Sequence, residues 1–269
     1  HVILCERSPE QAVQTNINGV QNVIAAADIN NVDVVIFTSS DKAVNPTNVM
    51  GTTKLMGERL MTAANSSKRE NGPKFASTRF GNVLGSNGSV IPIFRNQISN
   101  GGPVTLTDKN MTRFVMSVEE AVELVLNSVI EAKGGEVFVT KMPVMKIEDL
   151  AIAMIEELAL GKIEVTEIGS KPGEKLYEEL MSDEETRRTI ELDKFFSVLP
   201  AFRGIYNDID YNYSTIVSEL VEDPYVSEQQ TSLTVKEVKK FLNDNKLLLE
   251  SNTSEQDTRY WPGDKEEKV

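Results

Sequence analysis

The stretch that most constrains the fold is residues 33–54, in which an apolar segment is followed by a helix-forming one. Asp33–Ser40 is rich in β-branched and aromatic residues and ends in small hydroxyl residues, a pattern typical of a buried parallel strand reaching its carboxyl end. A proline turn comes next, and Thr47 or Asn48 can cap a helix by accepting a bond from a free backbone N–H. A strand followed by a helix is the repeating unit of α/β folds.

Reactive side chains gather where this strand ends. Ser40, Asp41 and Lys42 follow the apolar residues directly. Met50 and Lys54 are four residues apart on the next helix, so they share one face. We expect all five to converge at one mouth of a sheet, where Asp41 and Lys42 can serve as a general acid and a general base. The alternative for this pair is a surface ion pair in a loop.

The charge balance excludes two classes of partner. The formal net charge is −13, whereas a nucleic-acid or anionic-membrane binder needs a surplus of Lys and Arg. A phosphate-bearing ligand must therefore be held by local groups. Cys5 is the single cysteine, so we expect no disulfide, no metal site and a reducing, cytoplasmic compartment. No segment approaches the roughly 20 apolar residues of a membrane span.

The beginning of the chain is unusual for a dinucleotide-binding protein. His1 stands first, and the strand that should precede the opening helix is missing. No G-x-G-x-x-G turn follows a strand anywhere, although such a turn normally cradles the pyrophosphate. We therefore expect the chain to be the carboxyl-terminal part of a longer protein, with little activity of its own.

Strand and helix patterns alternate along the chain. The patterns predict a helix over residues 9–29 with Ser8 as its cap, a strand over 74–80, and a helix from about Val90. Gly81, Gly85 and Gly88 lie between this strand and the helix from Val90, and they permit close approach of the backbone to a ligand. Exposed N–H groups before that helix can hold an anion. The fold predicted is α/β, the second half of a doubly wound, Rossmann-like parallel sheet.

The later segments predict a small mixed lobe for the substrate. Short strands are expected at residues 104–108, 135–140 and 165–168, with amphipathic helices over 147–158 and 233–247.

We divide the chain into three parts. Residues 1–102 would be the remainder of the dinucleotide-binding domain, and residues 103–190 mainly the substrate lobe. Residues 191–269 would be an acidic extension with a mobile end.

The central stretch resembles a known family. A hydroxyl residue at a strand end, followed by a helix with Tyr-x-x-x-Lys, is similar to the extended short-chain dehydrogenase/reductases. The fuller text SDKAVNPTN is similar to their polysaccharide-biosynthesis branch, the nucleotide-sugar dehydratases that act on UDP-N-acetylglucosamine. Met50 stands where the ordinary family has Tyr, as in some members of that branch. Four further segments match the family in the same order: RFGNV, GSNGSVIP, MTRF and KPGEKL. The match therefore covers roughly residues 1 to 185.

The resemblance implies a lyase that converts UDP-N-acetylglucosamine to a UDP-4-keto-6-deoxy-hexosamine for surface polysaccharide. Such an enzyme moves a hydride from sugar C4 to a nicotinamide, eliminates water across C5 and C6, and returns the hydride to C6. By analogy Asp41 is the acid and Lys42 the base of the elimination. Ser40 would hydrogen-bond the reacting hydroxyl, and Lys54 would bind the nicotinamide ribose.

The family's motifs also suggest which residues bind ligands. NADP or NAD would be held by Lys54, Asn16, Phe80 and Gly81. The UDP-sugar would be held by Asn82, Ser89, Val90, Thr105, Arg113, Lys171 and Glu174. Arg113 suits bidentate phosphate binding, whereas Lys171 replaces the family's Arg and keeps its charge without its planar fork.

Two other functions stay open. A related NAD-dependent nucleotide-sugar epimerase would not need Asp41 and Lys42 as an elimination pair. A non-catalytic nucleotide-sugar-binding remnant is favoured by Met50 and by the absent glycine loop. The choice between NAD and NADP, the configuration at C5 and a membrane anchor upstream are open as well. We expect the full-length protein to be a homo-oligomer without a nucleic-acid partner.

Overall fold

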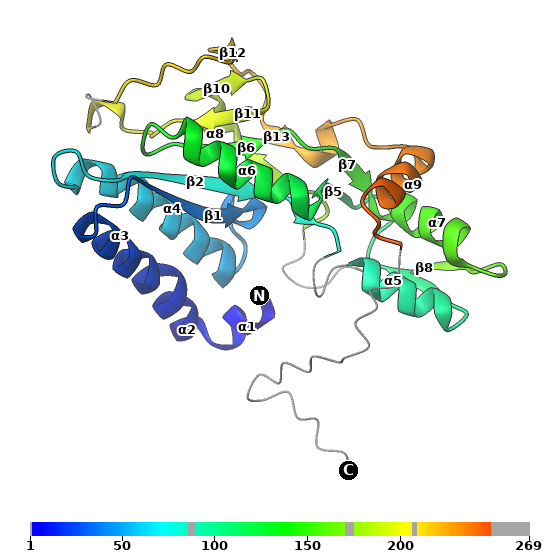
Figure 1. Ribbon diagram of the computed structural model, residues 1–269. Helices are drawn as coiled ribbons and strands as arrows, with labels where there is room; N and C mark the ends of the chain where they lie inside the picture. The colour runs from blue at the N-terminus through cyan, green and yellow to red at the C-terminus, as the bar shows by residue number, and fades with distance from the viewer. Residues whose placement is uncertain (1, 86–89, 170–174, 206–208, 249–269) are drawn as a thin grey trace.

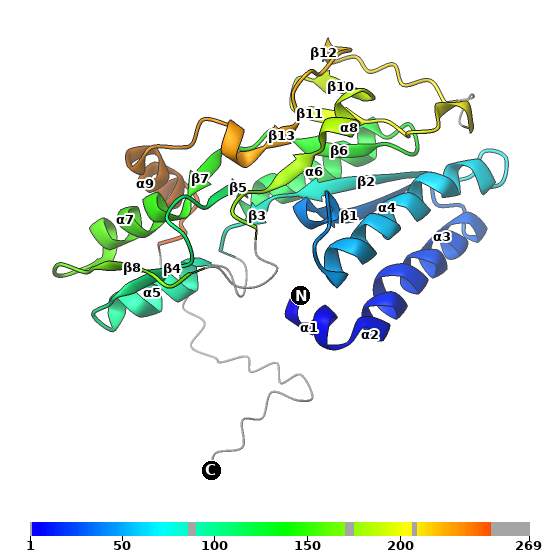
Figure 2. The same cartoon turned by 180° about the vertical axis from the view of Figure 1, so that it is seen from behind.

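The computed structural model describes residues 2–85, 90–169, 175–205 and 209–248. Its centre is a six-stranded mixed sheet with the strand order β1-β2-β6-β11-β10-β12 (Figures 1 and 2). In chain order these strands span Val34–Ser40, Lys74–Phe80, Val137–Thr140, Thr189–Leu192, Phe195–Val198 and Ile216–Ser218. The first three are parallel, and the other three run antiparallel to their neighbours.

The prediction of a parallel sheet is therefore right for β1, β2 and β6 and wrong for the rest. The register runs from Val34 opposite Lys74 to Ser40 opposite Phe80, so the carboxyl ends of β1 and β2 are level. We did not predict β10 and β11, because acidic residues interrupt the apolar pattern of these short strands. Because β10 begins at Thr189, the boundary we placed after residue 190 falls inside a strand of the central sheet.

Helices lie on both faces of the parallel strands (Figures 1 and 2). α4 (Val49–Ser67) lies on one face with α3 (Gly19–Ile29) beside it, and α6 (Val118–Glu131) lies on the other. The predicted cap of α4 is confirmed, because Asn48 accepts a hydrogen bond from the backbone N–H of Gly51. A capping box starts α6.

The single helix predicted over residues 9–29 is confirmed, and it contains one π-helical turn. α1 (Val2–Arg7) precedes it, α2 (Pro9–Val13) and a π-helical turn, Gln14–Asn18, form its first half, and α3 completes it. Ser8 makes no side-chain cap bond. A π-helical turn inside a helix often marks a functional site, and this one carries Asn16.

A second lobe is formed by segments before and after β6 in the sequence. Its sheet is β3-β5-β7 (Asn82–Val83, Thr112–Met116 and Val144–Lys146), and β4 (Val104–Leu106) pairs with β8 (Val165–Glu167). α5 (Val90–Ser99), α7 (Ile147–Leu158) and α9 (Val235–Asp244) share an apolar core with β4. Because Val238 and Leu242 of α9 are fully buried, residues well beyond 191 are part of this lobe.

Short elements connect the two lobes. β9 (Glu179–Met181) pairs with β13 (Tyr225–Val226), and α8 (Asp183–Thr186) leads back to the central sheet. Three 3-10 turns complete the described elements: η2 (Asp41–Ala43), η3 (Arg203–Ile205) and η4 (Ser227–Gln229). Across the described residues, every helix is too short or too polar to cross a bilayer. The end we expected to be mobile, residues 250–269, lies outside the described part of the chain.

Candidate active site

The predicted acid and base form an ion pair at the carboxyl end of β1. Asp41 and Lys42 lie in the turn η2, whose first backbone N–H groups are free to bond a cap. Ser40 Oγ accepts a hydrogen bond of 3.1 Å from the N–H of Lys42 and so fixes the turn. Lys42 Nζ donates to both carboxylate oxygens of Asp41, at 3.0 and 3.1 Å. The carboxylate is buried, since Asp41 is only 7% exposed.

A close helix contact holds this turn in place. A Cβ added at Gly51 would lie 2.1 Å from the carbonyl oxygen of Lys42 and 3.1 Å from Pro46 Cβ. Only glycine therefore lets α4 approach the turn this closely. We predicted no role for Gly51 from the sequence, because a single glycine inside a helix indicates close packing only when the neighbouring segment is known.

Replacing Gly51 with alanine should push the turn away from α4. Relief of such a contact by backbone movement typically costs about 1–3 kcal/mol. We expect a loss of this size in the free energy of unfolding, measured in urea. Gly161→Ala is the matched control, since a Cβ there meets nothing within 4 Å. Equal losses in the two variants would show that the close contact does not hold the turn.

Glu178 brings a third titratable group to this end of the sheet. Its carboxylate accepts hydrogen bonds from Asn82 Nδ2 at 2.8 and 2.7 Å and from the N–H of Phe114 at 3.2 Å. Arg113 Nε lies 3.3 Å away. Burial and the nearby Asp41 carboxylate raise the pKa of Glu178 to about 7. No pattern in the sequence indicated a role for Glu178, which lies two residues after the segment KPGEKL.

The charges around Lys42 favour its ammonium form. Burial alone would lower the pKa of Lys42, but the carboxylates of Asp41 and Glu178 raise it above the ordinary value. Lys42 is therefore protonated in the absence of substrate, and it can act as a base only after it has lost a proton.

Arg113 lies beside this group and is held by the chain itself. Its guanidinium donates to the carbonyl oxygens of Thr112, Lys175 and Leu176, at 2.8, 2.9 and 3.3 Å, in addition to its ion pair with Glu178. Arg113 thus anchors the segment that follows residues 170–174. Its predicted contact with a diphosphate stays a prediction.

The same segment is tied to the loop after Lys42. Lys175 Nζ donates to the carbonyl oxygen of Val44 at 3.0 Å, and Asn45 Nδ2 donates to Glu179 Oε2 at 2.8 Å. Residues 175–179 therefore bridge the second lobe and the turn that carries Asp41 and Lys42.

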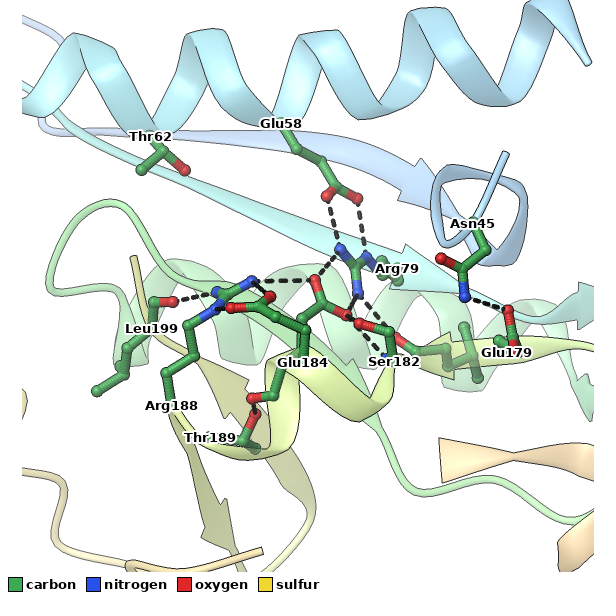
Figure 3. Close-up of polar contacts among 12 residues, drawn as sticks. Asn45, Glu58, Thr62, Arg79, Glu179, Ser182, Glu184, Arg188, Thr189 and Leu199 are labelled. Carbon is green, nitrogen blue, oxygen red and sulfur yellow. Dashed lines mark hydrogen bonds and ion pairs between the residues drawn. The ribbon is translucent and has the colours of Figure 1, made fainter. Parts of the chain in front are cut away.

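A buried charge network lies beside the bridge (Figure 3). Arg79 of β2 is 1% exposed and makes paired hydrogen bonds of 2.8 and 2.9 Å to Glu58 of α4. It also makes two bonds of 2.8 Å to Glu185 of α8, and it donates to the carbonyl oxygen of Leu180 at 2.9 Å. One side chain thus joins β2, α4 and the chain around β9 and α8.

Lys54 and Asn16 lie near each other on the α4 side of β1. Lys54 Nζ donates to the carbonyl oxygen of Thr38 at 2.9 Å, and burial lowers the pKa of its ammonium. Asn16 Nδ2 donates to Thr53 Oγ1 at 3.0 Å, and that hydroxyl donates to the carbonyl oxygen of Met50. Asn16 thus supports the helical turn from Met50 to Lys54. Lys54 is bonded to the backbone of β1 two residues before Ser40.

The other predicted ligand-binding residues have structural contacts. A Cβ at Gly81 would lie 2.8 Å from Met142 Sδ and from the carbonyl oxygen of Phe114, so this glycine makes room for the chain itself. Phe80 packs against the core of the central sheet. Thr105 is bonded to Gln97 through its N–H and its Oγ1, and Val90 starts α5 half-buried. Ser89, Lys171 and Glu174 lie outside the described residues.

Comparison with known proteins identifies the family. The profile of the family described as "Polysaccharide biosynthesis protein" matches residues 1–200. The chain belongs to this family. An uncharacterized membrane protein of Methanocaldococcus jannaschii is 52% identical over 206 residues, which are 74% of this chain and 62% of that protein.

Two relatives carry named activities. A UDP-N-acetylglucosamine 4,6-dehydratase (inverting) of Campylobacter jejuni is 40% identical over 217 residues, which cover 80% of this chain and 64% of that protein. A UDP-glucose 4-epimerase of Rickettsia bellii is 39% identical over 244 residues, 88% of this chain and 69% of that protein. The chain thus spans a little under two thirds of the length of the first two relatives.

Solved structures agree with this family fold. The X-ray structure of Pen from Bacillus thuringiensis superposes with a TM-score of 0.82 at 42% identity, over 93% of this chain and 73% of that one. A UDP-glucose 4-epimerase of Thermus thermophilus, solved in complex with NAD, has a TM-score of 0.55 at 20% identity over 64% of this chain and 63% of that one. At that identity the second likeness concerns the fold alone.

Proposed function

We propose that this chain is the part of a nucleotide-sugar 4,6-dehydratase that carries the elimination chemistry, with UDP-N-acetylglucosamine as substrate. The observation that supports the proposal most is the ion pair between the buried Asp41 carboxylate and the half-buried Lys42 ammonium. Ser40 caps its turn and Gly51 lets α4 pack against it. A hydride-transferring epimerase has no need of such a fixed pair, whereas an elimination needs both an acid and a base.

A single proton shift prepares the pair for elimination. Moving one proton from Lys42 Nζ to Asp41, along their hydrogen bond of 3.0 Å, converts the ion pair into a neutral amine and a neutral acid. A bound sugar that excludes water favours this neutral form, because desolvation disfavours charge. The amine then takes the C5 proton, and the acid protonates the C6 hydroxyl, which leaves as water as the C5–C6 double bond forms. The ion pair is thereby restored.

A nicotinamide cofactor, when bound, would supply the removal of hydride from C4 and its return to C6. The half-buried Lys54 ammonium at the end of β1 and the Asn16-supported turn beside it fit the ribose end of that group. We propose Lys54 and Asn16 for that role. We propose Asn82 and Arg113 for the UDP-sugar, because both lie against Glu178 near Asp41 and Lys42.

Product mass tests this function. The protein, expressed with whatever its gene encodes before His1, should convert UDP-N-acetylglucosamine to a product lighter by one water. An epimerase would give a product of unchanged mass with an inverted hydroxyl, and a non-catalytic binding protein would give none. Either result would contradict the proposal. The epimerase is the second candidate, favoured by the 39% identity to the Rickettsia protein.

Met50 should be a wall of the site and not a proton carrier. A thioether has no ionisable proton, so it cannot take the hydroxyl proton as hydride leaves C4. The candidate acceptors are Asp41 and a water near Ser40 and Lys54. Because Asp41 receives the Lys42 proton before the elimination, we propose that the hydroxyl proton goes to the water. Met50→Leu should therefore change kcat little, in keeping with the small cost of volume-conserving apolar swaps. A large loss of kcat in this variant, at unchanged stability, would assign a direct role to the sulfur.

A further inference from the structure

Glu178 is surrounded by donors that point at its carboxylate. Asn82 Nδ2 contacts both of its oxygens, and the N–H of Phe114 and Arg113 Nε reach one oxygen each. The backbone around Glu178 is fixed as well. Its N–H donates to Ser227 Oγ at 2.9 Å, and its carbonyl oxygen accepts from the N–H of Ser227. With its side chain 5% exposed, Glu178 is a rigid buried acceptor.

The Glu178 carboxylate and the carbonyl oxygen of Phe114 together determine which way the Asn82 amide faces. Asn82 Nδ2 also donates to the carbonyl oxygen of Phe114 at 3.1 Å, so all of its bonded neighbours are acceptors. An ionised carboxylate and a backbone carbonyl cannot donate, so only the NH2 end of the amide can face them. The group that Asn82 can offer to a ligand is then Oδ1, which is an acceptor.

We infer that Glu178 is a positioning residue that fixes Asn82 Oδ1 as an acceptor for a donor on the sugar, a hydroxyl or acylamino N–H, and not for the diphosphate. The inference rests on the proposed function and refines it, since it separates recognition of the sugar from recognition of the phosphates. Phosphate oxygens accept hydrogen bonds and would be repelled by Oδ1. They suit the Arg113 guanidinium, which Glu178 also contacts.

Ionisation of Glu178 should control the orientation. The charged groups that face its carboxylate are Asp41, Lys42 and Arg113, and burial together with Asp41 raises the pKa of Glu178 to about 7. Above this pH the carboxylate holds the Asn82 NH2. Below it, a protonated Glu178 becomes a donor and no longer requires the NH2 end of Asn82 to face it.

The side-chain amide signals of Asn82 in the free chain test directly whether Glu178 orients the Asn82 amide. In NMR spectra they should titrate between about pH 6 and 8, the range set by a group of pKa near 7. They should not titrate in Glu178→Gln. Glu228→Gln, at an exposed position in η4, should behave like the unchanged chain. Flat signals in the unchanged chain, or an unaltered titration in Glu178→Gln, would overturn the inference.

Calorimetry with UDP-N-acetylglucosamine and with UDP tests which part of the ligand Asn82 meets. Glu178→Gln should weaken the UDP-sugar about tenfold, the scale of one lost hydrogen bond, and leave UDP nearly unchanged. Asn82→Ala should do the same, and the double variant should lose no more than either single one. Equal losses for both ligands, or additive losses, would overturn the role assigned to Glu178. If the unchanged chain binds neither ligand, the proposed function and the sugar contact both fail, and the NMR titration still decides whether Glu178 orients Asn82.

Discussion

Replacing Arg79 with methionine should destabilise the fold by about 3–5 kcal/mol, the usual cost of removing one partner from a buried ion pair. The variant would leave the Glu58 carboxylate buried without a counter-charge, and it would leave the buried Glu185 with only its 3.4 Å ion pair to Arg188. It would also free the carbonyl oxygen of Leu180, next to the segment that reaches Glu178. Urea unfolding measures the loss.

Arg69→Met is the matched control for this prediction. Arg69 pairs with Asp28 at 3.5 Å on the surface, where both side chains are partly exposed, so its loss should cost less than about 1 kcal/mol. Similar losses in the two variants would contradict the role given to the buried network. Adding Glu58→Gln and Glu185→Gln to Arg79→Met should recover part of the stability, because the buried charges are then removed as well.

Acid provides an independent check on the same network. Burial opposes ionisation of Glu185, but the Arg79 guanidinium dominates and lowers the pKa of Glu185 to about 2, from an ordinary value of 4.5. A lowered pKa stabilises the fold above the unfolded value, and this stabilisation is lost as the pH falls from about 4.5 towards 2. Arg79→Met should flatten this part of the stability profile.

The second large effect concerns turnover. Asp41→Asn and Lys42→Ala should each lower kcat for the dehydration on the order of 100-fold or more, the scale of a lost general acid or base. Asn cannot supply a proton to the C6 hydroxyl, and Ala cannot take one from C5. Binding of the UDP-sugar should change little, because neither residue is proposed to contact the nucleotide. Near-full turnover by Asp41→Asn would contradict the assignment of the acid.

Strand and helix bounds could be predicted where local patterns carry the information. Residues 34–40 begin with an apolar run, residues 74–80 lie between the turn residues Gly-Pro and Gly-Asn, and residues 147–158 have helical spacing; each became the expected element. The ion pair of Asp41 and Lys42 was predictable for the same reason, since adjacent residues share one turn.

Features that depend on distant partners could not be read from the sequence. A glutamate looks the same in a solvated loop as at Glu178, and only the fold brings Asn82, Arg113 and Phe114 to it. Arg79 is likewise polar in the sequence and buried in the structure, because Glu58 and Glu185 come from other elements. The antiparallel strands β10 to β12 were missed because each is short and is stabilised by its neighbours in the sheet.

Exchange of the C5 proton with solvent tests the central claim most directly. The protein should be incubated in D2O with UDP-N-acetylglucosamine, and deuterium at C5 of the sugar followed by mass spectrometry and NMR. If Lys42 removes the C5 proton, the unchanged protein should incorporate deuterium there. Lys42→Ala should do so on the order of 100-fold more slowly, at similar UDP-sugar binding. An unchanged rate of C5 exchange in Lys42→Ala would exclude Lys42 as the base and would contradict the proposed elimination pair.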